Sequence, residues 1–182
     1  MKPQNIILEG ICGSQAYGLA NEDSDADIKG IYVAPTSEVL GLPQFNPCNT
    51  IDHTDPDWLY HEIGRYISLA LKANPTVTEL LWLEGYRVLT KQGHMLVDNR
   101  HLFLSTPAVK NAYTGYCYSQ AHKLIARGGS YGNGRNKRYE KHTRHLLREE
   151  IKKFENIKSV LPDKPDYEGV NKLLLKIRKG NW

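Results

Sequence analysis

The stretch "GSQAYGLANEDSDAD", residues 13–27, decides how this chain is interpreted. It follows the apolar run "NIILEGIC", which is typical of a short buried strand. The pair Gly13-Ser14 is separated by ten residues from Asp25 and Asp27, which have a single alanine between them. Because "DADIKGIYV" (residues 25–33) alternates like a strand, both carboxylates are expected to lie side by side on one face.

These residue types point to metal and phosphate chemistry. Two neighbouring carboxylates repel each other unless a cation or a proton neutralises them. Hard oxygen ligands favour Mg²⁺ or Mn²⁺, and Mg²⁺ normally keeps waters and completes its shell with substrate phosphates. Glycine lets the backbone approach a ligand closely, so Gly13 and the Ser14 hydroxyl are expected to hold phosphate oxygens. The combination predicts phosphoryl or nucleotidyl transfer, whereas a solvated turn at "NEDSD" is the non-functional alternative.

The quoted stretch also resembles a known signature. Its Gly-Ser pair, Ala-Tyr-Gly (residues 16–18) and Ser-Asp-Ala-Asp (residues 24–27) are similar to those of nucleotidyltransferases of the DNA polymerase beta superfamily. More narrowly, they resemble a predicted family of RNA-ligase-associated (RlaP-like) nucleotidyltransferases. The resemblance continues over most of the chain, in "ISLALKANPTVTELLW" (67–82), "GYCYSQAHKLI" (115–125) and "KHTRHLLR" (141–148).

The resemblance implies that Asp25 and Asp27 are catalytic metal ligands and that a neighbouring strand supplies a third carboxylate. The position of this third acid in the family falls on Asp57. The resemblance therefore implies that Asp57 is a catalytic residue and a metal ligand. Asp52, on the short strand expected at "NTIDHTD", is the alternative.

A structural interpretation competes with that role for Asp57. Asp55-Pro56-Asp57 has the composition of a helix start, because Asp caps a helix, Pro suits its first turn and an acid favours its dipole. The helical spacing of apolar residues over 59–71 predicts a helix from residue 57 onwards, ending at Asn74-Pro75.

A strongly basic stretch lies near the C-terminal end, with six Lys or Arg residues over 135–148. By itself such a helix is usually a solvated face. The acidic site, however, needs a cationic partner for a triphosphate. Together with the resemblance at "KHTRHLLR", this implies that Lys141 and Arg144 contact phosphates of the nucleotide or the acceptor. Tyr17, just after the Gly-Ser turn, is expected to line either a base pocket or the core.

Composition limits the class of protein. The chain has 182 residues, 40% hydrophobic and 24% charged, with a net charge of +4, which suits one compact domain or two packed lobes. The longest apolar runs are far shorter than the roughly 20 residues of a membrane span, and the N-terminus lacks a signal-peptide core. Three scattered cysteines without a CxxC pair argue against a disulfide framework or a zinc site. We therefore expect a cytoplasmic protein with no membrane partner.

The order of the predicted elements gives the fold class, α+β. Residues 1–104 are expected to form a polymerase-beta-like nucleotidyltransferase unit, a short mixed sheet with helices. Residues 105–182 are expected to form a helical C-terminal half packed on it. Its helices begin near Pro107, near Asn136 and after Pro165-Asp166.

The sequence therefore predicts an Mg²⁺- or Mn²⁺-dependent nucleotidyltransferase. It would transfer a nucleoside monophosphate from a nucleoside triphosphate to a hydroxyl and release pyrophosphate. An RNA end is one candidate acceptor, and a protein side chain or a small molecule are others. A non-catalytic nucleotide- or RNA-binding module on the same fold is the alternative, and a nucleic-acid-binding protein whose acids are irrelevant is a third.

Overall fold

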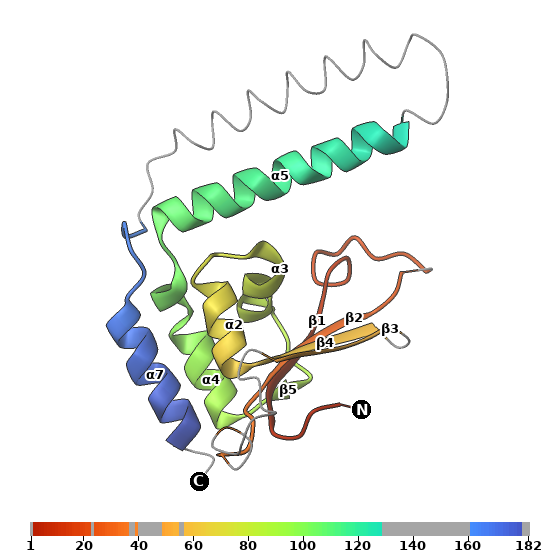
Figure 1. The fold of residues 1–182 in the computed structure, drawn as a ribbon. Helices are drawn as coiled ribbons and strands as arrows, with labels where there is room; N and C mark the ends of the chain where they lie inside the picture. Colours follow the sequence, from red (N-terminus) through yellow and green to blue (C-terminus); the bar gives the residue numbers. More distant parts are fainter. Residues whose placement is uncertain are drawn as a thin grey trace.

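The computed structural model describes residues 2–22, 24–36, 39, 49–54, 57–128 and 161–179, with side chains up to 119 in the long helix. At its centre is a five-stranded sheet in the order β3-β4-β2-β1-β5 (Figure 1). β2 and β4 run parallel, and the other pairs are antiparallel, so the sheet is mixed. The strands are β1 (Ile6–Cys12), β2 (Asp27–Tyr32), β3 (Thr50–Thr54), β4 (Asp57–Glu62) and β5 (Val88–Leu89).

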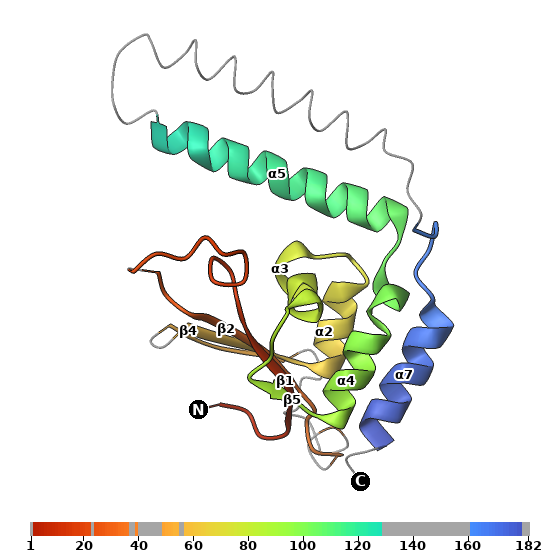
Figure 2. The same cartoon turned by 180° about the vertical axis from the view of Figure 1, so that it is seen from behind.

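Helices cover one side of this sheet. Figures 1 and 2 show α2, α4 and α7 on that side, while α5 crosses above α3. None of the helices in the described part of the chain is both long and apolar enough to cross a bilayer. The elements are α2 (Ile63–Ala70), α3 (Pro75–Thr78), the 3₁₀ turns η1 (Glu79–Trp82) and η2 (Arg100–Phe103), α4 (Lys91–Asp98), α5 (Thr106–Gly128) and α7 (Tyr167–Lys179). The predicted α+β class is confirmed.

Strand alternation gives the sheet two apolar faces. On the helical face, Leu8 and Ile31 pack with Tyr66, Leu96 and the other members of the main core. On the opposite face, Trp58 and Tyr60 of β4 pack against Tyr32 of β2, with Trp58 and Tyr60 in an edge-to-face contact. The sheet is thus fixed from both sides, which holds the starts of its central strands in place.

Helix α7 joins the main core rather than standing apart from it. Val170, Leu173 and Ile177 are buried there. Beside them, Nη2 of Arg178 lies 2.8 Å from Oε1 of the fully buried Glu62, the last residue of β4. The C-terminal helix is therefore tied to the same strand that begins at Asp57. The division into units 1–104 and 105–182 stays a prediction.

The helix predicted from residue 57 is wrong over its first six residues, which form β4. Trp58, Tyr60 and Glu62 are buried in alternation, and β4 pairs with β2 and β3 on its two sides. Helix α2 begins only at Ile63, where the Glu62 side chain accepts a hydrogen bond from the Gly64 amide at 2.6 Å. Pairing within the sheet has therefore overridden the helical spacing of the later apolar residues.

Candidate active site

Asp27 and Asp57 stand next to each other at the starts of two parallel strands. The β2–β4 register pairs Ile28 with Trp58, so the residues one step earlier share the opposite, helical face of the sheet. Burial and the charge of Asp57 raise the pKa of Asp27, although the nearby Lys29 ammonium opposes this shift. Two carboxylates held this close make a site that favours a cation.

Gly13 lies directly against Asp27, one member of this acid pair. It follows Cys12, the residue that pairs with Asp27 across β1 and β2. Its φ of +67° lies in the left-handed region, and a Cβ built on it would lie 2.0 Å from Oδ2 of Asp27. Any other residue would therefore be strained and would displace the carboxylate. This explains why the turn begins with glycine.

The turn itself is closed by backbone hydrogen bonds. The Tyr17 amide donates to the Gly13 carbonyl at 3.3 Å, and the Leu19 amide donates to the Ser14 carbonyl at 2.8 Å. Ser14 is half-buried at the start of this turn. The backbone at Gly13 is thereby fixed beside the acids, as a phosphate-binding turn requires.

Polar side chains form a bridge between β2, which begins at Asp27, and η1. Lys29, two residues after Asp27 on the same face, forms an ion pair with Glu79 of η1 and donates to the Thr76 carbonyl at 3.0 Å. The Tyr17 hydroxyl donates to Oε2 of Glu79 at 3.0 Å. Burial and this hydrogen bond raise the pKa of Tyr17 to about 12, so the phenol stays protonated. The bridge connects the strand, the turn and η1.

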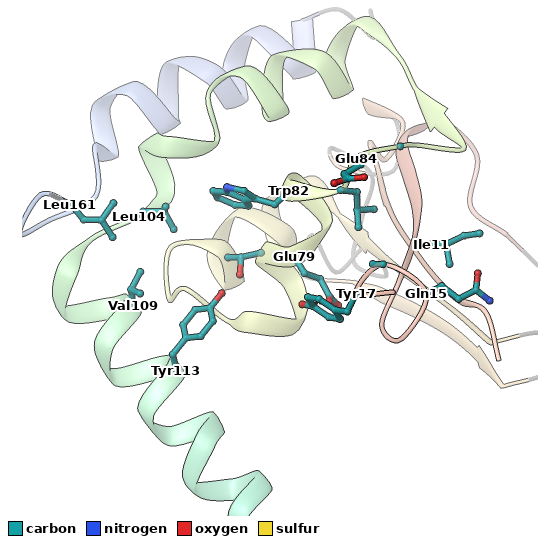
Figure 3. Close-up of a pocket in the computed structure, with 14 residues that line it drawn as sticks. Ile11, Gln15, Tyr17, Glu79, Trp82, Glu84, Leu104, Val109, Tyr113 and Leu161 are labelled. Atoms are coloured by element: carbon teal, nitrogen blue, oxygen red, sulfur yellow. The ribbon is translucent and has the colours of Figure 1, made fainter. Parts of the chain in front are cut away.

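Beyond the bridge lies a cavity of about 650 Å³ (Figure 3). It lies between the turn, η1 and the start of α5, and both Tyr17 and Glu79 contribute to its wall. In Figure 3, Trp82 and Tyr113 point toward the space between them. The polar and aromatic residues that line it are Gln15, Tyr17, Thr78, Glu79, Trp82, Glu84 and Tyr113. Tyr17 thus lines a pocket rather than the core, while its predicted contact with a base stays a prediction.

Comparison with known proteins agrees with this geometry. Residues 1–152 match the model of RlaP, the RNA repair pathway DNA polymerase beta family. The chain belongs to this family. The predicted resemblance is thereby confirmed, and the family is one of polymerase-beta-like nucleotidyltransferases.

One curated relative is an "uncharacterized 38.9 kDa protein in nrdC-mobD intergenic region" of enterobacteria phage T4. It is 26% identical over 134 residues, covering 67% of this chain. The chain spans only 39% of the length of that phage protein. No solved structure matches the chain.

The structure brings together some of the predicted site residues of this RlaP-family chain. Asp27, Asp57 and Asp52 line one small hollow of about 210 Å³, with Asp52 exposed on β3. Asp25 is exposed in the loop before β2, because the strand predicted from residue 25 begins at Asp27. The strand alternation that paired Asp25 with Asp27 therefore does not apply, and the metal role of Asp25 stays a prediction.

Lys141 and Arg144 lie outside the described residues, so their contact with phosphate stays a prediction. Lys29 was missed, although its position two residues after Asp27 on one strand already placed it on the same face. Trp82, Glu84 and Tyr113 were missed as a group because the fold, rather than the sequence, brings them together.

Proposed function

We propose that this chain is a metal-dependent nucleotidyltransferase that transfers a nucleoside monophosphate from a nucleoside triphosphate to a hydroxyl. The observation that carries this proposal is the pairing of Asp27 with Asp57, with Gly13 pressed against Asp27. The family description supports the coarse class, and the geometry supports these residues as its acidic site. Asp25 is proposed to join them when the substrate is bound.

The donor set fits a hard divalent cation. Within the described residues, no three His, Cys, Asp or Glu side chains gather into a group that could hold a metal ion. Mg²⁺, however, is commonly held by one or two carboxylates, and waters and substrate phosphates complete its shell. When bound, Mg²⁺ or Mn²⁺ would hold the triphosphate and lower the pKa of the attacking hydroxyl. Asp27 and Asp57 are proposed as its protein ligands.

The proposed reaction balances without any other reactant. The acceptor oxygen forms a bond to the α-phosphorus, the bridging bond between the α- and β-phosphates breaks, and the hydroxyl proton passes to solvent. Pyrophosphate leaves with the electron pair of the broken bond. Gly13 and Ser14 are proposed to hold the triphosphate, because the closed turn fixes their backbone beside the acids. Lys141 and Arg144 are proposed to offset the charge that builds on pyrophosphate.

An RNA end is the acceptor that we favour. The family description names an RNA repair pathway, and the basic stretch over 135–148 would suit a phosphate backbone. Within the part of the chain that the structure describes, no third carboxylate joins the pair closely enough to hold a metal ion, and this favours one second candidate, a nucleotide- or RNA-binding module without turnover. That module would bind nucleotide but release no pyrophosphate.

The test is a transfer assay on the full chain with α-labelled nucleoside triphosphates, Mg²⁺ and RNA oligonucleotides that carry free hydroxyl ends. We expect label on the RNA and release of pyrophosphate, both reduced by orders of magnitude in Asp25→Asn and Asp27→Asn. Glu22→Gln, which changes an exposed acid of the same loop, is the matched control and should stay active. Nucleotide binding without pyrophosphate release would support the module instead. Full activity of Asp27→Asn would contradict the assignment of Asp27 to the acidic site.

A further inference from the structure

The cavity shown in Figure 3 is lined by side chains whose role the acidic site does not explain. Three aromatic side chains and two carboxylates contribute to its wall, from Tyr17, Trp82, Tyr113, Glu79 and Glu84. None of its described lining residues is a Lys or an Arg. A phosphate group there would meet the carboxylates of Glu84 and of Glu79, which is paired with Lys29, and no described lining residue would offer it a cation, so the cavity is unsuited to the triphosphate itself.

A flat, largely apolar ring with a polar edge fits this wall better. Trp82 is 43% exposed and Tyr113 is 38% exposed, which is high for large aromatic side chains. The Arg100 guanidinium lies over the Trp82 ring at 5.2 Å and donates to the Leu81 carbonyl at 2.9 Å, which holds the indole in place. Exposed, fixed aromatic rings are the usual platform for a nucleobase, and the volume lies in the range of small-molecule pockets.

The two carboxylates of the wall differ in what they can offer a ligand. Glu79 is already engaged by Lys29 and by the Tyr17 hydroxyl. Glu84 is exposed two residues after the end of η1, and as a carboxylate it only accepts hydrogen bonds. Adenine and cytosine present an exocyclic amino group that donates, and guanine carries one at N2, whereas uracil has no exocyclic amino group.

From this wall we infer that the cavity is a nucleobase pocket that prefers an amino-bearing base, with stacking on Trp82 and Tyr113 and Glu84 as the specificity residue. The inference rests on the proposed function and adds a substrate preference to it. The turn over 13–17 joins the two sites, because Gly13 contacts Asp27 while Gln15, Ala16 and Tyr17 line the cavity. A base in the pocket therefore leaves its phosphates on the side of the acids.

The bound base would belong to one of two molecules, the nucleoside triphosphate or the terminal nucleotide of an RNA acceptor. Both share the same ring chemistry. A probe that reports on the pocket without turnover separates this inference from the transfer reaction. The indole N–H signal of Trp82 in a proton–nitrogen correlation spectrum, assigned by its loss in Trp82→Phe, is such a probe.

The experiment titrates the full chain, without divalent metal, with each of the four ribonucleosides and with inorganic triphosphate. We expect adenosine, cytidine and guanosine to shift the Trp82 signal at lower concentration than uridine, by on the order of tenfold, the factor that about 1.4 kcal/mol produces. Inorganic triphosphate should leave this signal unchanged. Glu84→Gln should abolish the preference while nucleosides still bind, and Glu168→Gln, an exposed acid on α7, should preserve it.

A second arm identifies the source of the base. A non-hydrolysable nucleoside triphosphate that occupies the pocket and resists competition by a short RNA assigns it to the donor nucleotide. Displacement by the RNA assigns it to the acceptor. Tyr113→Leu, a change of an exposed side chain, should weaken binding of all four nucleosides. The inference is overturned if inorganic triphosphate alone shifts the Trp82 signal, or if Glu84→Gln leaves the order of the bases unchanged.

Discussion

Asp57 lies beside Asp27 across two parallel strands, and burial together with this neighbouring charge raises the pKa of the Asp27 carboxyl. A carboxyl with a raised pKa binds its proton more tightly in the folded chain than in the unfolded chain. Its protonation therefore favours the fold at low pH, and this contribution is lost as the pH rises through the folded pKa. At neutral pH the ionised pair opposes folding unless a cation neutralises it.

The first prediction is a stability test of that pair. At neutral pH without metal, Asp27→Asn should raise the melting temperature, because the neutral amide removes the repulsion. For a chain of this size the gain should be about 2–4 °C per kcal/mol relieved. Mg²⁺ should raise the melting temperature of the wild-type chain and have little effect on the variant. Thermal melts followed by circular dichroism measure both, and equal stabilisation of the two proteins by Mg²⁺ would contradict the pairing.

The second prediction separates two properties of Gly13, its left-handed backbone and its contact with Asp27. Gly13→Ala and Gly18→Ala both place an L-residue at positive φ (+67° and +66°), which costs about 1–2 kcal/mol. Only Gly13 has a neighbour there, Oδ2 of Asp27, since no atom lies within 4 Å of a Cβ at Gly18. Denaturant unfolding should therefore show a larger loss of stability for Gly13→Ala.

A double variant identifies the cause of that excess. In the background of Asp27→Ala, the difference between Gly13→Ala and Gly18→Ala should largely disappear. An unchanged difference would show that the Asp27 carboxylate is not what Gly13 accommodates.

The elements of the fold that could be predicted from the sequence are those marked by a pattern of neighbouring residues. The strands on either side of the Gly-Ser turn were evident from local patterns, an apolar run before the turn and an alternating run after it. β4 was missed because Leu59, Ile63 and Tyr66 also fit a helical period, and Asp55-Pro56-Asp57 has the composition of a helix start. Parallel pairing of β2 with β4 joins residues about thirty apart in sequence, which no local pattern encodes.

The residues of the candidate site also divide into those that a local motif predicts and those that only the fold brings together. The acids and the glycine belong to one short motif, so the sequence indicated their chemistry. The proximity of Asp57 to Asp27 followed from the resemblance and not from the residues between them. No local pattern singles out Glu79, and only the fold shows it bonded to Lys29 and Tyr17.

The third prediction concerns the link between α7 and β4. Arg178→Met leaves the buried Glu62 carboxylate without its guanidinium partner, which should cost about 3–5 kcal/mol of unfolding free energy. Burial raises the pKa of Glu62 and Arg178 opposes that shift, so the variant should raise it further. The deficit should therefore be largest at neutral pH and shrink as Glu62 becomes protonated at lower pH.

The control for this prediction is an ion pair on the surface of the same helix. Lys172 and Glu168 lie 2.6 Å apart and are 68% and 79% exposed, so Lys172→Met should change stability by less than about 1 kcal/mol. Denaturant unfolding at several pH values measures both variants. A pH-independent loss in Arg178→Met would contradict the role assigned to the pair.

The fourth prediction concerns the basic stretch. If Lys141 and Arg144 contact phosphate, Lys141→Ala and Arg144→Ala should lower nucleotide affinity or turnover more than Lys137→Ala does. Each lost charge-assisted hydrogen bond should cost about 1.5–3 kcal/mol. Nucleotide titrations and transfer assays on the three variants decide this. Equal, small effects in all three would assign the stretch to a solvated basic face.

The most direct test of the acidic site is Mn²⁺ binding to the full chain with a non-hydrolysable nucleoside triphosphate, followed by electron paramagnetic resonance. The variants are Asp27→Asn, Asp57→Asn and Asp52→Asn, which change three acids of the same small hollow. We predict that the first two lose most of the bound Mn²⁺, while Asp52→Asn binds it like the wild-type chain. Wild-type binding by Asp57→Asn, or a loss confined to Asp52→Asn, would contradict the assignment of Asp27 and Asp57 as the metal-binding pair.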